Sequence, residues 1–325
     1  MLFIFSDLNG TILAFEHHRY DAAIPAIERL KSHKIPLILT TGQTYDETIH
    51  FLKEINLIEP VIFENGSGIL IPKEHKLYSS IFLSNTILFF ELDDYIIIQK
   101  GHSKQKIDNA LKAIEKELRE QDFYRKLRLV GFRELELYEL RKLLNEASNS
   151  KLKAAKNRLF SESFEVFTDD DYCEGSLNIK EVSFAMPGES ELLQPSLKML
   201  NKIASKYDCQ VLKGGLSYHL LSNNCSKGST IKWFLSKMRR AYPEQKIASV
   251  GIGDGQNDVS MLLSVDKAIV IPSKISYRIQ DEIKTNEWFQ SAFPAPEGWA
   301  NSINSILDKT LYPDLPITLG DKQHI

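Results

Sequence analysis

The residues best suited to chemistry lie at the end of the first apolar run. The segment Asp7-Leu8-Asn9-Gly10-Thr11 directly follows residues 2–6, an apolar run with the length of a buried strand. In parallel α/β sheets the reactive crevice lies beyond the carboxyl ends of the strands, so a carboxylate there can attack a phosphoryl group and form an aspartyl-phosphate. Gly10 allows a sharp turn and lets backbone N–H groups approach phosphate oxygens. Alone, the segment is equally compatible with a simple turn at the end of a strand.

Two further segments could bind phosphate. Thr41-Gly42 follows the apolar run at 35–40, where a hydroxyl and an N–H could bind a phosphate oxygen or cap a helix. Lys227 begins a helix expected over 227–240, although a cation is unfavourable at that end of the helix dipole. A lysine there is useful if it neutralises a phosphate and the charge of the nucleophile. The alternative for Lys227 alone is an exposed surface lysine.

A metal site is predicted in the segment Gly253-Asp254-Gly255-Gln256-Asn257-Asp258. Its two carboxylates are four residues apart, after an apolar run at 247–252 and before a short helix. Such a pair suits Mg²⁺, which prefers oxygen ligands and often shares them with phosphate. The alternative is a loop with an acidic helix start, but the strongly apolar run before it favours the metal site.

The elements that must position these residues alternate between strand and helix at both ends of the chain. This pattern predicts an α/β core, a doubly wound parallel sheet of the Rossmann-like type, built from residues 1–82 and 224–312. The middle of the chain, 83–223, mixes helices and strands without this order, which predicts an inserted α+β cap domain. We expect the cap to close over the crevice and bind the organic part of the substrate. Residues 313–325 form a tail.

Composition limits the classes of function. The 325 residues are 43% hydrophobic and 26% charged, which suits two domains with sizeable cores. The net charge of -3 indicates neither nucleic acid nor an anionic membrane as partner. Three cysteines without metal-ligand spacing indicate free thiols in a reducing compartment. Because no apolar stretch is long enough for a signal peptide or a membrane helix, we expect a cytoplasmic protein.

Taken in order, the four segments are far more specific than each is alone. Asp-x-Asn-Gly-Thr, Thr-Gly, Lys-Gly and Gly-Asp-Gly-x-Asn-Asp together resemble the haloacid dehalogenase superfamily. The insert between the second and third segments resembles the subgroup with a large α+β cap. The resemblance implies a Mg²⁺-dependent phosphatase with Asp7 as nucleophile and with Lys227 in the catalytic centre. It implies metal ligation by Asp7, the Asn9 carbonyl, Asp254 and Asp258, and phosphate binding by Asp7, Leu8, Asn9, Thr41, Gly42, Lys227 and Asn257.

A closer resemblance covers most of the chain. Glu64-Asn65-Gly66-Ser67-Gly68, Lys213-Gly214-Gly215, Pro294-Ala295-Pro296-Glu297-Gly298-Trp299 and the stretch 137–162 look like mannosyl-3-phosphoglycerate phosphatases. This resemblance implies a small phosphorylated sugar or glycosylglycerate as substrate, with glucosyl-3-phosphoglycerate or sucrose phosphate as alternatives. The substrate-binding residues would be Gln43, Asn65, Gly66, Arg158, Lys213, Gly214 and Gly215. For Arg158, an exposed position on a lysine-rich helix is equally compatible with the sequence.

Asn9 departs from the superfamily pattern, which has an aspartate there. By resemblance that aspartate is the general acid and base, and an amide can fill neither role, so we expect strongly reduced activity. The backbone carbonyl of Asn9 could still bind the metal. Two explanations compete: a deliberate substitution that slows an active phosphatase, and a catalytically silent relative that binds phosphosugars without cleaving them. The other core motifs are intact, which favours the first.

Overall fold

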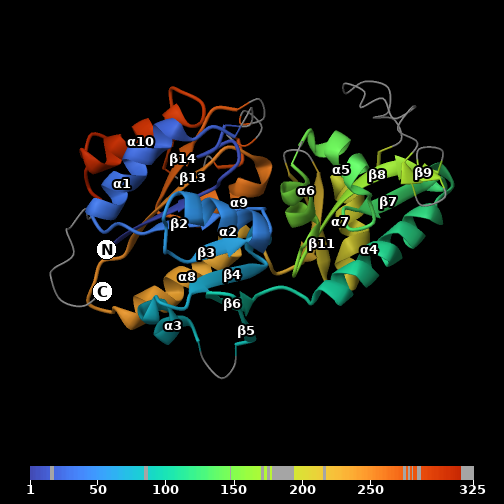
Figure 1. Cartoon of the computed structure of the whole chain (residues 1–325), viewed down its shortest axis with the longest axis horizontal. Helices are drawn as coiled ribbons and strands as arrows, with labels where there is room; N and C mark the ends of the chain where they lie inside the picture. Colours follow the sequence, from blue (N-terminus) through green and yellow to red (C-terminus); the bar gives the residue numbers. More distant parts are fainter. Residues whose placement is uncertain are drawn as a thin grey trace. The chain divides into compact units, whose positions relative to one another are not determined.

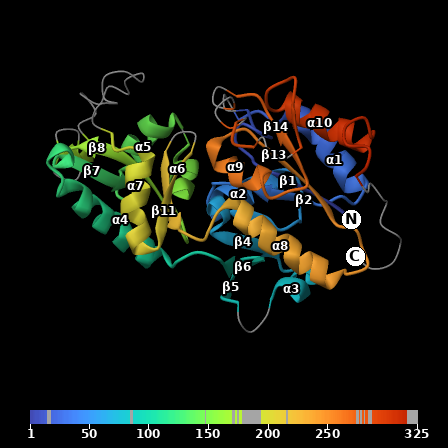
Figure 2. The same cartoon turned by 180° about the vertical axis from the view of Figure 1, so that it is seen from behind.

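The chain divides into two compact units in the computed structural model (Figures 1 and 2). The first comprises Met1–Gly42, Phe51–Lys100 and Cys225–Ile325, and the second comprises Gln43–His50 and Gly101–Asn224. The structure describes residues 1–14, 18–83, 87–146, 148–169, 172–173, 176–177, 194–214, 217–273, 276, 279, 281–283 and 287–315. Within these ranges, no helix has the length and apolar character required to cross a membrane.

A mixed sheet forms the centre of the first unit. In the described residues its strand order is β15-β14-β13-β1-β2-β3-β4-β6-β5. The strands from β15 to β3 are parallel, and β4, β6 and β5 continue the sheet in antiparallel pairing. The bounds are β1 Leu2–Ser6, β2 Leu37–Thr40, β3 Val61–Phe63, β4 Gly68–Pro72, β5 Phe89–Leu92, β6 Tyr95–Gln99, β13 Ala248–Gly253, β14 Lys267–Val270 and β15 Trp288–Gln290. The predicted α/β fold is therefore confirmed.

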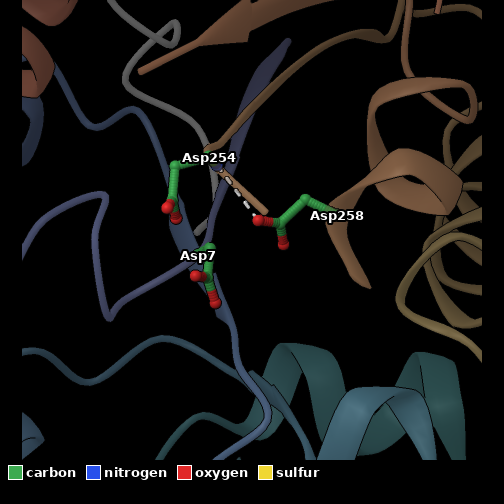
Figure 3. Close-up of side chains that lie close together, drawn as sticks. All are labelled: Asp7, Asp254 and Asp258. Carbon is green, nitrogen blue, oxygen red and sulfur yellow. Dashed lines mark hydrogen bonds between the residues drawn. The ribbon is translucent and has the colours of Figure 1, made fainter. Parts of the chain in front are cut away.

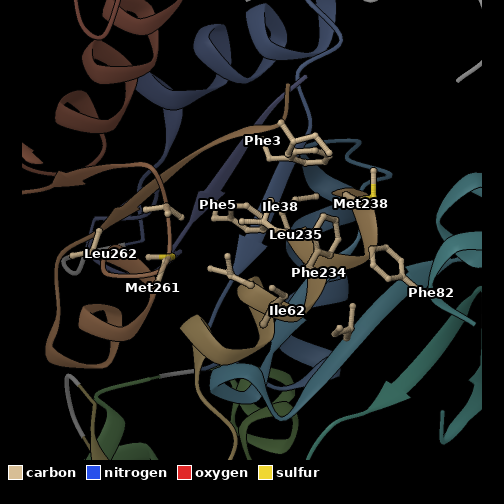
Figure 4. Packing of buried hydrophobic residues seen from close by; sticks show 14 of the residues in the cluster. Phe3, Phe5, Ile38, Ile62, Phe82, Phe234, Leu235, Met238, Met261 and Leu262 are labelled. Atoms are coloured by element: carbon tan, nitrogen blue, oxygen red, sulfur yellow. The ribbon is translucent and has the colours of Figure 1, made fainter. Parts of the chain in front are cut away.

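Helices cover both faces of this sheet. Successive side chains of β1 point to opposite faces, and those on each face contact a helix. Phe3 and Phe5 lie against Phe234 of α8, with ring centroids 5.6 and 5.7 Å apart (Figure 4). Burial of each ring stabilises the fold by roughly 2–3 kcal/mol. On the opposite face, Ser6 accepts a hydrogen bond from Trp299 of α10. The helices of this unit are α1 Ile24–Ser32, α3 Lys76–Phe82, α8 Lys227–Ala241, α9 Val259–Leu262 and α10 Glu297–Leu307. Helix α2, Tyr45–Glu54, is divided: residues 45–50 group with the second unit and 51–54 with the first.

The contact between Trp299 and Ser6 fixes the end of β1. The buried indole Nε1 of Trp299 donates to Ser6 Oγ at 2.9 Å, and Ser6 Oγ in turn donates to the carbonyl of Asp7 at 2.8 Å. A buried indole N–H needs an acceptor, so this pairing selects one orientation of α10 on the sheet. The aromatic end of the Pro294–Trp299 segment therefore holds the strand end from which Asp7 follows.

The second unit is built on an antiparallel sheet with strand order β11-β12-β8-β7. One face is covered by α4 and α7, and the other face packs against α5 and α6. The bounds are α4 Lys104–Arg119, β7 Leu127–Gly131, α5 Leu137–Leu144, α6 Asn149–Lys156, β8 Glu162–Thr168, α7 Leu197–Ala204, β11 Cys209–Lys213 and β12 Tyr218–Ser222, with a short pair β9 Tyr172–Cys173 and β10 Ser176–Leu177. The sequence also predicts a strand at 181–186, but these residues lie outside the described part of the chain.

Strands β5 and β6 change the proposed boundary of the insert. Both were expected in the cap, which the sequence places at 83–223. Instead β6 pairs with β4, and β5 with β6, so they extend the sheet of the first unit. The alternation of apolar residues predicts strands here but not the sheet that they join, because pairing partners are set by tertiary contacts. We therefore propose that the insert begins at residue 101.

A half-buried carboxyl just before β3 makes the stability of the first unit depend on pH. Glu59 accepts a hydrogen bond from Tyr78 Oη at 3.0 Å, and burial raises the pKa of Glu59 to about 7. Because the unfolded chain ionises near pH 4.5, the wild-type protein loses stability as pH rises from there to 7. At pH 8 we expect Glu59→Gln to be more stable by about 1–3 kcal/mol, with the difference fading toward pH 4.5. Urea midpoints at pH 5 and 8 test this. The exposed Glu74→Gln is the control, and equal pH profiles for all three proteins would contradict it.

Candidate active site

Asp7 and Lys227 form the centre of a buried ionic cluster in the first unit. Asp7 directly follows β1, is 6% exposed, and accepts a hydrogen bond from Lys227 Nζ at 2.5 Å through Oδ1. The same ammonium donates to Oδ1 of Asp258 at 2.6 Å. Lys227 has no exposed surface, so it is not the surface lysine that its sequence context alone allowed. A buried ammonium between two carboxylates offsets part of their charge.

The start of α8 brings Lys227 to this place. Ser226 caps the helix, and it exchanges backbone-to-side-chain hydrogen bonds with Ser229. The chain at Gly66 lies so close that a Cβ there would be 2.2 Å from the Ser226 carbonyl oxygen, and its φ of +92° also favours glycine. Thr230 Oγ1 donates to the Gly66 carbonyl at 2.7 Å. Gly66, predicted to bind substrate, therefore positions the first turn of α8.

Three carboxylates converge beyond the ends of β1 and β13 (Figure 3). Oxygen atoms of Asp7, Asp254 and Asp258 all lie within 4.8 Å of one another. Thr11 Oγ1 donates to Asp254 Oδ1 at 3.1 Å, whereas Asp254 Oδ2 is buried without a hydrogen bond to any described residue. Asp258 Oδ2 accepts from the backbone N–H groups of Asp254 and Gly255 at 3.1 and 3.0 Å. Asp254 therefore offers an uncommitted ligand atom, while both oxygens of Asp258 are already engaged.

The cluster favours protonated carboxyls as long as no further cation enters. Burial and then the charge of Asp258 raise the pKa of Asp7 to about 7, against the opposing effect of Lys227. Burial and the charges of Asp258 and Asp7 raise the pKa of Asp254 to about 8. A bound divalent cation would stabilise the ionised forms of both groups. The all-oxygen ligand set and the orphaned Asp254 Oδ2 fit such a cation, so this triad could hold one divalent metal.

Replacement of the buried ammonium tests this electrostatic balance. We expect Lys227→Met to lower the free energy of unfolding by about 3–5 kcal/mol at pH 8, because the variant leaves buried carboxylates without a partner. The loss should shrink at pH 5, where the carboxyls can bind protons instead. Denaturant midpoints at both pH values measure it. Lys232→Met, on the exposed face of the same helix, is the matched control, and similar small losses in both variants would contradict the balance.

Two predicted phosphate-binding segments, Thr41-Gly42 and Asn257, lie together with Asn65, which was predicted to bind substrate. The backbone N–H of Asn65 donates to the Thr41 carbonyl at 2.9 Å, and Asn257 Nδ2 donates to Asn65 Oδ1 at 3.2 Å. A Cβ placed on Gly42 would lie 3.1 Å from Asn65 Nδ2, so these groups are neighbours. Asn65 Nδ2 is buried and donates no hydrogen bond within the described chain. This donor could bind an oxygen of a ligand.

The turn after Asp7 is largely buried. Leu8 is fully buried, and its carbonyl accepts the N–H groups of Thr11, Ile12 and Leu13 at 3.3, 3.0 and 2.8 Å. The side chain of Leu8 thus belongs to the core, and its predicted phosphate contact could involve only the backbone N–H. Asn9 is partly exposed and forms a backbone bridge with Leu13.

The remaining predicted substrate residues belong to the second unit. Arg158 is 5% exposed, so it is not the surface arginine that the sequence allowed. Lys213 Nζ lies 3.9 Å from the ring centroid of Tyr218, and Gly214 follows at the end of β11. Gln43 groups with this unit as well. Gly215 lies outside the described residues.

Two polar side chains of the site had no role in the sequence analysis. Thr11 binds Asp254 and Ser6 links β1 to Trp299. The sequence contained a signal for Thr11, since it closes the first chemical segment, but its partner is 243 residues away. No local pattern distinguishes Ser6 from any other polar residue at a strand end.

Comparison with known proteins identifies the class. A model of the haloacid dehalogenase-like hydrolases matches residues 4–276. The chain belongs to this family and is therefore a hydrolase by class. This family assignment agrees with the resemblance found in the four core segments.

Two relatives of known name match almost the whole chain. A protein from Persephonella marina, named glucosyl-3-phosphoglycerate/mannosyl-3-phosphoglycerate phosphatase, is 28% identical over 94% of this chain and 97% of its own. A protein of the same name from Methanococcoides burtonii is 27% identical over the same shares.

Solved structures share the fold at lower identity. The sucrose-phosphatase of Synechocystis sp. PCC6803, in complex with sucrose and phosphate, has a TM-score of 0.53 and 15% identity, covering 94% of this chain and 96% of that one. A sugar phosphatase of subclass IIB of the superfamily has a TM-score of 0.54 and 13% identity, with 94% and 99% coverage. At this identity the likeness concerns the fold alone.

Proposed function

We propose that the chain is a Mg²⁺-dependent phosphatase for the phosphomonoester of a glycosyl-3-phosphoglycerate, such as mannosyl-3-phosphoglycerate, a free metabolite of the cytoplasm. The observation that supports it most is the buried Lys227 between Asp7 and Asp258, beside the uncommitted oxygen of Asp254. The names of the relatives from Persephonella marina and Methanococcoides burtonii support the substrate class.

In the proposed first step, a carboxylate oxygen of Asp7 attacks phosphorus, and the bond between phosphorus and the 3-oxygen of the glycerate breaks. Lys227 neutralises charge on Asp7 before attack and on the phosphoryl oxygens afterwards. Mg²⁺, held by Asp7, the backbone carbonyl of Asn9 and Asp254, would offset the remaining negative charge of the phosphoryl group. Asp258 orients Lys227 through the 2.6 Å hydrogen bond rather than serving first as a metal ligand.

In the second step, water attacks the phosphorus of the aspartyl-phosphate, which releases phosphate and restores the Asp7 carboxylate. Each step needs the transfer of a proton: to the leaving glycerate oxygen in the first step and from the attacking water in the second. Asn9 can do neither, so both steps are slow in this chain. The leaving oxygen must then take its proton from solvent.

The same proposal assigns the other predicted residues. The phosphate group would be bound by the backbone at Leu8 and by Thr41, Gly42 and Asn257, with the free amide of Asn65 directed to the same ligand. The second unit would act as the cap and bind the organic part through Gln43, Arg158, Lys213, Gly214 and Gly215. The grouping of the described residues into separate units supports this division.

A substrate panel tests the proposal. Phosphate release is measured with Mg²⁺, and with EDTA as control, from mannosyl-3-phosphoglycerate, glucosyl-3-phosphoglycerate, sucrose phosphate and 3-phosphoglycerate. Because turnover should be slow, the assay uses the chain and its Asn9→Asp variant side by side. Preference for a glycosyl-3-phosphoglycerate supports the substrate class; preference for sucrose phosphate overturns it but keeps the chemistry.

Asn9 favours one alternative of a different kind, a phosphosugar-binding module without catalysis. That alternative predicts tight binding of the phosphorylated ligand and no gain of turnover in Asn9→Asp. Calorimetry together with the panel separates the two, since only a disabled enzyme gains activity when the carboxyl is supplied.

A further inference from the structure

The second unit contains a hollow with a pronounced excess of cations. The hollow has a volume of about 530 Å³ and lies along the first turns of α4, with the chain at 157–159 opposite. Its lining includes Lys104, Lys112, Arg133 and Arg158 but a single acid, Asp108. The other lining residues are three amides and one leucine. This lining suits a hydrophilic anion and not an apolar ligand.

The ion pairs around the hollow leave this excess in place. Lys104 Nζ donates to both Asp108 and the buried Glu162, so its charge is already balanced. Arg133 approaches Asp108 only to 3.8 Å, and its side chain is 56% exposed. Even with Glu162 counted beside Asp108, the four cations leave about two positive charges in surplus. A surplus of this size matches a dianion.

Arg158 distinguishes the hollow from an ordinary solvated helix face. Its side chain is 5% exposed, and Nη1 donates to Ser161 Oγ at 3.2 Å. Burial of a guanidinium costs several kcal/mol unless charge or hydrogen bonds compensate. The neighbouring carboxylate of Glu162 is bound to Lys104 through Oε2. An anion bound in the hollow would lower the cost of burying Arg158, and a guanidinium fork matches phosphate geometry.

We propose that this hollow binds a small phosphate dianion, either inorganic phosphate or the phosphate group of a phosphomonoester. The site is built from residues of the second unit alone, and Arg158 is the residue that it shares with the proposed substrate-binding set. Its volume is large enough for a three-carbon phosphomonoester, whose hydroxyls the lining amides could bind. The proposal does not depend on the phosphatase assignment.

Binding is measured in EDTA, so that no metal attracts phosphate to the site around Asp7. Isothermal titration of the full chain uses inorganic phosphate and 3-phosphoglycerate as probes. We expect one equivalent to bind, and affinity to fall at least tenfold in the double variant Lys112→Gln/Arg133→Gln. Equal affinity for both probes would assign recognition to the phosphate group; tighter binding of 3-phosphoglycerate would assign it to a phosphomonoester. Either result supports the site.

The matched control removes two positive charges elsewhere on the second unit. Lys106→Gln/Lys116→Gln alters exposed positions of α4 that do not line the hollow, so affinity should stay within about twofold. Equal losses in both double variants would mean general charge attraction and would overturn the site. Absence of binding by the unaltered chain would also overturn it. Circular dichroism checks that all variants are folded.

Discussion

Replacing Asn9 by aspartate is expected to raise the kcat of phosphate release by about 10²–10⁴-fold, with little change in KM. The new carboxyl, two residues after Asp7, could protonate the leaving glycerate oxygen and then accept a proton from water. Nearby buried carboxylates would raise its pKa, which suits a general acid. The turn itself should persist, because backbone hydrogen bonds such as Gly10 N–H to Leu13 O at 2.7 Å hold it.

A matched control separates the role of this carboxyl from the effect of added negative charge. Asn257→Asp makes the same chemical change at a residue whose amide donates to Asn65. We expect no gain there, and weaker substrate binding, because a carboxylate would repel the phosphate. Single-turnover phosphate release from mannosyl-3-phosphoglycerate measures both. No gain in Asn9→Asp, from any sugar phosphate, would leave the binding-module alternative as the better account.

Much of the core was predictable because its signals are local. The apolar run at 2–6, the helix from Lys227 and the acidic segment at 254–258 each follow from neighbouring residues. In a parallel sheet the carboxyl ends of strands meet at one edge, so residues that follow different strands can be expected together. The convergence of Asp7 and Asp254 illustrates this rule, since β1 and β13 are paired neighbours in the sheet.

Other features could not be predicted because they depend on partners distant in sequence. The role of Gly66 follows from the approach of the Ser226 carbonyl, 160 residues later. The sheet assignment of β5 and β6 depends on pairing with β4, which apolar alternation does not encode. Lysine side chains are usually exposed, whereas Lys227 is fully buried. The two carboxylates that accept hydrogen bonds from its ammonium, those of Asp7 and Asp258, explain this exception.

Replacing Asp7 by alanine in the Asn9→Asp background is expected to abolish turnover, with a loss of at least about 10⁴-fold. We expect no other carboxylate of the triad to replace it, because Asp258 binds Lys227 and two backbone N–H groups, and the uncommitted oxygen of Asp254 is assigned to the metal. Asp7→Asn keeps the shape and should be equally inactive. Turnover that survives in either variant would rule out the aspartyl-phosphate route.

In Asp7→Asn we expect stability to stay the same or to rise although activity is lost. Misfolding would then not explain the loss of activity. Since the pKa of Asp7 is raised to about 7, its ionisation costs the folded state stability as pH rises from near 4 to 7. In EDTA at pH 8, Asp7→Asn should therefore be at least as resistant to urea as its parent, while Lys227 keeps Asp258 as partner. An inactive variant with lower stability would instead make Asp7 a structural residue. Asp7 is thus expected to destabilise the folded state. Lys227 and a divalent cation reduce this cost because they offset its charge.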